Sequence, residues 1–73
     1  MRIVIINPNS DSAQTAQIDR AAKAFAADRF EVVTLATPGA PQYIDTCMDA
    51  AKALPGMLAL VEQWEEQADA YVI

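Results

Sequence analysis

The stretch from Arg2 to Ser12, R-I-V-I-I-N-P-N-S-D-S, decides the fold. It contains four consecutive apolar residues, Ile3 to Ile6, and an unbroken run of this kind is typical of a strand that is covered on both faces. Pro8 has no N–H to donate to a sheet and favours an extended conformation at the residue before it, so the strand should end at Asn7. The stretch therefore predicts a buried strand over residues 2–7, followed by a polar loop.

The polar residues after the strand predict the start of a helix. Ser10, Asp11 and Ser12 are residue types that cap helix N-termini, and Gln14 follows Asp11 at the spacing of a capping box. We expect a helix over residues 12–27, because its apolar residues recur at helical spacing. These residues are Ile18, Ala21, Ala22 and Phe25. On residue types alone, turn and cap chemistry without a ligand is the simpler explanation of this polar segment.

The remaining residues predict two further strands and one further helical segment. Residues 31–36, E-V-V-T-L-A, are rich in β-branched side chains and predict a strand. Residues 37–42 contain two prolines and a glycine and predict a loop. Residues 43–67 have a helical apolar pattern that Pro55 interrupts, so we expect a broken helix there. Residues 69–73 predict the last strand.

The order strand, helix, strand, helix, strand places the chain in the α/β class. Crossovers of this length make the strands parallel, so we expect a three-layer α-β-α arrangement of the flavodoxin-like type, incomplete at its C-terminal end. In such sheets ligands bind beyond the carboxyl ends of the strands, where no residue follows Ile73. We therefore expect residues 1–73 to be the N-terminal part of one longer domain. A complete small domain is the alternative, which the limited core of so short a chain disfavours.

Composition excludes several classes of function. The formal net charge of −5 argues against nucleic acid and anionic membranes as partners. The chain has no histidine and a single cysteine, Cys47, which excludes an internal disulfide and the usual zinc sites. We predict that Cys47 is a small buried apolar residue. No apolar run has the length of a membrane span, and the N-terminus does not read as a signal peptide, so we expect a cytoplasmic location.

Four segments of the chain, taken in order, resemble one protein family. R-I-V-I-I-N-P-N-S at Arg2 to Ser10 is similar to the opening of the hydantoin racemases, in the aspartate/glutamate racemase superfamily. P-x-x-I-D at Pro41 to Asp45, L-P-G-M-L at Leu54 to Leu58 and A-D-A-Y-V-I at Ala68 to Ile73 also resemble the pattern of that family. The resemblance covers the whole chain, but only about the first third of a typical member.

The resemblance implies a racemase that uses no cofactor and acts at an acidic α-carbon of hydantoins or amino-acid-like substrates. Two cysteines, one on each side of that carbon, would remove and return the proton. Both would lie beyond Ile73, so we expect residues 1–73 alone to be inactive. The resemblance assigns substrate binding to the loop of Asn7, Pro8, Asn9 and Ser10. Amide side chains and backbone N–H groups would hold the carbonyls of the substrate, and Pro8 would set the turn.

Two other functions stay open at this point. A flavodoxin-like module could hold phosphate or FMN in the segment N-S-D-S-A-Q-T that starts at Asn9, although this segment has no glycine and Asp11 would repel a phosphate. A non-catalytic assembly piece is the other alternative. For the racemase, we expect a small-molecule substrate and self-association through the exposed sheet edge or a helix face.

Overall fold

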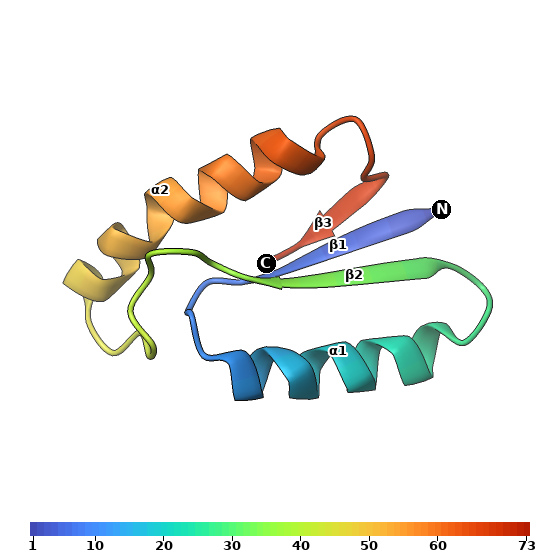
Figure 1. Ribbon diagram of the computed structural model, residues 1–73, viewed down its shortest axis with the longest axis horizontal. Helices are drawn as coiled ribbons and strands as arrows, with labels where there is room; N and C mark the ends of the chain where they lie inside the picture. Colours follow the sequence, from blue (N-terminus) through green and yellow to red (C-terminus); the bar gives the residue numbers. More distant parts are fainter.

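The computed structural model, which describes residues 1–73, is built on a parallel sheet of three strands (Figure 1). The elements are β1 (Arg2–Asn7), α1 (Ser12–Ala26), β2 (Glu31–Ala36), α2 (Cys47–Trp64) and β3 (Ala70–Val72). The sheet order is β2-β1-β3, so the first strand of the chain is the central one. Figure 1 shows α1 and α2 on opposite sides of the sheet. This arrangement confirms the expected three-layer α/β fold.

The core lies between the central strand and α2. Val4 and Ile6 of β1 are fully buried and pack with Leu60 of α2. Ile3 and Ile5, which alternate with them, are partly buried. Successive side chains of a strand point to opposite faces of a sheet, so the unbroken apolar run of β1 serves both covering layers. Each fully buried aliphatic side chain contributes about 1.5–3 kcal/mol relative to an exposed one.

Helix α1 meets the sheet through a face that matches the predicted one only in part. Ala26 is buried and Ile18 and Ala22 are partly buried, whereas Phe25 is 70% exposed. The Phe25 ring instead lies beneath the guanidinium of Arg29, whose carbon is 4.8 Å from the ring centroid. Placing Phe25 in the apolar face was therefore wrong: the inner face runs through positions 18, 22 and 26, and the aromatic ring lies beside it.

Helix α2 also differs from the prediction of a broken helix over residues 43–67. It is one continuous helix that begins at Cys47, because Thr46 is its N-cap and accepts a hydrogen bond from the Asp49 N–H (3.1 Å). Pro55 lies inside the helix and is exposed, as is Ala51, the residue four positions before it. The carbonyl that loses its partner can therefore bind water, which is why the proline does not end the helix.

The apolar residues of α2 fall on two faces. Leu60 is buried against β1 and Ala53 is also buried, whereas Leu54 and Leu58 are 51% and 55% exposed. Cys47, in the first turn, is exposed too, so its prediction as a buried residue was wrong. Neither α1 nor α2 has the length and apolarity that a membrane-spanning helix needs.

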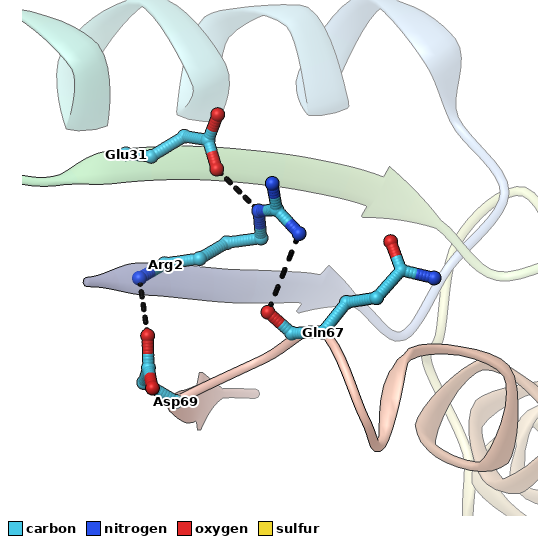
Figure 2. Close-up of polar contacts among 4 residues, drawn as sticks. All are labelled: Arg2, Glu31, Gln67 and Asp69. Atoms are coloured by element: carbon cyan, nitrogen blue, oxygen red, sulfur yellow. Dashed lines mark hydrogen bonds and ion pairs between the residues drawn. The ribbon is translucent and has the colours of Figure 1, made fainter.

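Polar contacts join the amino ends of the three strands (Figure 2). The Arg2 guanidinium donates to the Glu31 carboxylate and to the Gln67 carbonyl oxygen. The Arg2 backbone N–H donates to the Asp69 carboxylate (2.7 Å), and the Asp69 N–H donates back to the Arg2 carbonyl (2.8 Å). Both partners of the Arg2–Glu31 ion pair are partly exposed, so the pair adds little stability and mainly fixes the register.

A second ion pair lies on α1, and its contribution to stability should depend on pH. Lys23 Nζ is 3.0 Å from Asp19 Oδ2, and this hydrogen bond lowers the pKa of Asp19 below its ordinary value of 3.8. The Thr34 hydroxyl also lowers the pKa of Asp19, although the hydroxyl and the carboxylate do not meet the distance and angle limits of a hydrogen bond. Since the folded pKa is depressed, the ion pair stabilises the chain above the unfolded pKa. That contribution disappears as the pH falls through the folded value.

We expect NMR titration of Asp19 to give a midpoint below 3.8, and Lys23→Met to raise it. Arg20→Met is the matched control, because Arg20 acts only through the weakest of the causes and should move the midpoint less. A midpoint that Lys23→Met leaves in place would contradict this assignment.

Candidate functional site

The candidate site lies at the carboxyl end of the sheet, where the loop after β1 meets the loop after β2 (Figure 1). Two backbone hydrogen bonds join the loops: Ser10 N–H donates to the Pro41 carbonyl (3.0 Å), and Thr37 N–H donates to the Asn9 carbonyl (3.1 Å). In open α/β sheets this edge is where ligands bind. The segment from Asn7 to Ser10 lies at this edge, and its individual side chains decide what it can do.

Asn7 is turned into the loop. The residue is only 6% exposed, and its Nδ2 donates to Asn9 Oδ1 (2.8 Å) and to Thr15 Oγ1 (3.0 Å). Its Oδ1 accepts from the Asn9 N–H (3.4 Å). Both amide hydrogens of Asn7 are therefore used within the chain, and they hold β1, the loop and the first turn of α1 together.

Pro8, Asn9 and Ser10 are partly buried. Unlike Asn7, Asn9 and Ser10 keep hydrogen-bond donors that have no partner within the chain. Asn9 Oδ1 also accepts from the Asp11 N–H (3.0 Å), while its Nδ2 gives one hydrogen to Gln14 Oε1 (2.6 Å) and keeps the second free. The Ser10 hydroxyl has no partner within the chain. Pro8 has no N–H and acts only through its fixed backbone angle. The free donors of the loop therefore come from Asn9 and Ser10.

The N-terminus of α1 adds backbone donors to this surface. Asp11 is the N-cap, as predicted, and accepts from the Gln14 N–H (3.3 Å). The reciprocal half of the predicted capping box is not formed, because the Gln14 side chain binds Asn9 instead. The N–H groups of Ser12 and Ala13 have no acceptor within the chain, as expected for the first turn of a helix. They lie at the positive end of the helix dipole.

These groups can hold a carbonyl or enolate oxygen, but they cannot move a proton by themselves. Residues 1–73 enclose no pocket and contain no group of three side chains suited to a metal ion. Cys47, the single thiol, is exposed at the start of α2. Sequence reasoning did not predict that the side chains of Thr15, Gln14 and Thr37 bind the loop internally; it assigned Gln14 only to the cap of α1. Only Thr37 carried a signal, because it follows β2 at the edge that already located Asn7.

Comparisons with known proteins match all or nearly all of the chain. The family described as Asp/Glu/Hydantoin racemase matches residues 3–73. Hydantoin racemases from Pseudomonas sp. (strain NS671) and Rhizobium meliloti are 34% and 39% identical to it over 74 positions. Each alignment covers 100% of this chain, but only 30% and 31% of the relative. The structure of allantoin racemase from Klebsiella pneumoniae superposes with a TM-score of 0.90 at 34% identity, again covering 100% of this chain and 30% of that one.

Proposed function

The chain belongs to the Asp/Glu/hydantoin racemase family, and from this premise we propose that it supplies the carbonyl-binding part of a racemase. The substrate class proposed is a hydantoin or a related small molecule with an acidic C–H beside a carbonyl. The observation that carries the proposal is the group of unoccupied donors at the carboxyl edge of the sheet. The family relatives and the solved neighbour are named for substrates of this kind.

The chemistry assigns a role to these donors. Removal of the α-proton moves the C–H electron pair into the adjacent carbonyl, so negative charge develops on that oxygen. Preorganised N–H donors stabilise such an oxygen more than the neutral carbonyl, and this difference lowers the barrier. The donors proposed to face it are those of Asn9, Ser10 and the first turn of α1. Asn7 and Pro8 contribute to the same site by setting the shape of the loop.

The acid and base are proposed to lie outside residues 1–73. Inversion of the carbon needs one group to take the proton on one face and a second group to return a proton on the other. The chain has one thiol and no histidine, so it cannot provide the pair of thiols. The remaining length of the relatives, about 70% by the coverage above, is where we place them. We also propose that the racemase uses no cofactor, that it is cytoplasmic, and that it self-associates through β3 or the exposed face of α2.

A chimera tests the proposal. Residues 1–73 would replace the matching segment of the Pseudomonas hydantoin racemase, and racemisation of an enantiopure 5-substituted hydantoin would be followed by polarimetry. We expect the chimera to racemise the substrate and the isolated chain to be inactive. Turnover by the chain alone would refute the placement of the two thiols. A folded chimera without activity would refute the function itself.

Two matched variants of the chimera locate the contact with the substrate. Asn9→Ala should lower kcat/KM by about tenfold or more, since it removes an amide donor at the site. Gln17→Ala makes the same loss of a side-chain amide at an exposed position of α1 and should leave kcat/KM unchanged. Equal effects of the two substitutions would remove Asn9 from the substrate site.

A further inference from the structure

We infer that Thr37 is a positioning residue for the segment from Asn7 to Ser10, an inference that rests on the function proposed above. Thr37 follows the last residue of β2, and its side chain is 0% exposed. Its hydroxyl donates to the Asn7 carbonyl (2.7 Å), and its backbone N–H donates to the Asn9 carbonyl (3.1 Å). One buried residue thus binds two carbonyl oxygens of the loop, on either side of Pro8.

These two bonds fix the direction of the donors in the loop. Each peptide unit is planar, so a carbonyl oxygen that is held in place also holds the N–H of the next residue. Binding the Asn9 carbonyl therefore orients the Ser10 N–H, which donates to Pro41 in the loop after β2. The Ser10 hydroxyl and the start of α1 follow directly from this point. A shift of Thr37 would move the proposed substrate donors as a group.

The contact is not an extension of the sheet. Pairing between β1 and β2 ends at Asn7 and Ala36, so Thr37 lies beyond the last paired residue. The bond to Asn7 comes from its side chain, which a parallel ladder does not use. The pairing of β1 with β2 therefore does not need this hydroxyl. The hydroxyl restrains the loop after β1 instead.

Helix α2 keeps the Thr37 side chain in its orientation. A Cβ atom placed on Gly56 would lie 2.7 Å from Thr37 Cγ2 and 2.4 Å from the Pro38 carbonyl oxygen. The backbone of α2 therefore packs directly against Thr37 and the residue after it. With its methyl group against the helix, the hydroxyl is directed at Asn7. Contacts through Thr37 therefore link α2, the end of β2 and the loop after β1.

The test compares two threonines of the chimera whose hydroxyl groups are buried, Thr37 and the partly buried Thr34. Thr37→Val keeps the shape and removes the hydroxyl that binds Asn7, whereas Thr34→Val removes a buried hydroxyl without a partner. We expect Thr37→Val to lower kcat/KM by about 10- to 100-fold and to raise KM by at least about threefold, because misplaced donors also bind the substrate less well. Thr37→Ser, which restores the hydroxyl, should recover activity to within about threefold, and Thr34→Val should retain it.

Amide hydrogen exchange at Ser10 in the same chimera gives a readout that does not need activity. Thr37→Val keeps the backbone N–H that binds the Asn9 carbonyl and releases only the Asn7 carbonyl, at the start of the loop. If that bond holds the whole loop in place, Thr37→Val should still accelerate the exchange of the Ser10 N–H by about tenfold or more, and Thr34→Val should not. An inactive parent chimera with this exchange pattern would refute the proposed function and retain the positioning role of Thr37. An unchanged KM with a fall in kcat alone would mean only fewer folded molecules, and would overturn the inference, as would failure of Thr37→Ser to recover activity.

Discussion

Replacing Gly56 by alanine is expected to lower the free energy of unfolding by about 1–3 kcal/mol, the usual cost of forcing extra volume into a packed contact. The added methyl would lie 2.4 Å from the Pro38 carbonyl oxygen, which is a backbone atom and cannot rotate away as a flexible side chain could. Either α2 moves off the sheet or the loop after β2 shifts. Urea unfolding followed by far-UV circular dichroism measures the effect.

The sign of this change separates packing from helix propensity. At an exposed helical position, glycine is about 1 kcal/mol less favourable than alanine, so Gly56→Ala would stabilise α2 if nothing lay beside it. Ala59→Gly, on the exposed side of the same helix, is the matched control and should cost about 1 kcal/mol. A Gly56→Ala variant more stable than the parent would show that α2 does not approach the loop as closely as described.

The features that sequence reasoning found depend on chemistry local to a few residues. Asn7 and Pro8 end a continuous apolar run, and proline removes a sheet donor wherever it stands, so the end of β1 follows from residue types alone. Asp11 caps α1 for an equally local reason. The location of the candidate site then follows from topology, because parallel strands bring their carboxyl ends to one edge.

The features it missed depend on which helix face meets the sheet. Phe25, Leu54 and Leu58 fit a helical apolar pattern, yet all three are exposed, because the pattern is wider than the contact that the sheet offers. Cys47 was misplaced for a related reason: the helix was started too early, and Thr46 was not identified as the cap. The spacing of Thr46 and Asp49 did carry that signal, in the form of a cap with an acidic residue in the first turn.

The bonds that Asn7 makes within the site could not be predicted from the sequence. An asparagine at the end of a strand can bind a ligand or its own loop, and both uses need the same residue type. The folded structure shows that the Asn7 amide donates both of its hydrogens within the chain, to Asn9 and Thr15. The bond from Thr37 joins residues 30 positions apart, which no local pattern encodes.

An Asn7→Asp variant should therefore be among the least stable single variants of this chain, by about 3 kcal/mol at neutral pH. The substitution keeps the shape of the side chain but replaces the two donated hydrogens by a carboxylate oxygen. That oxygen would face Asn9 Oδ1 and Thr15 Oγ1, and the Thr15 hydroxyl already donates to the Asp11 carbonyl (2.8 Å). A buried charge would then face two oxygens and no donor in this direction.

The pH dependence of this variant identifies the cause. Burial and the facing oxygens should raise the pKa of the introduced carboxyl above its unfolded value of about 3.9. The folded state then binds the proton more tightly, so the loss of stability relative to the parent should shrink as the pH falls through the raised pKa. Asn9→Asp is the matched control, because Asn9 is more exposed than Asn7 and its Oδ1 accepts from the Asp11 N–H, a bond that a carboxylate would keep. A pH-independent loss, or an equal loss in both variants, would mean that Asn7 is not the buried brace of the loop.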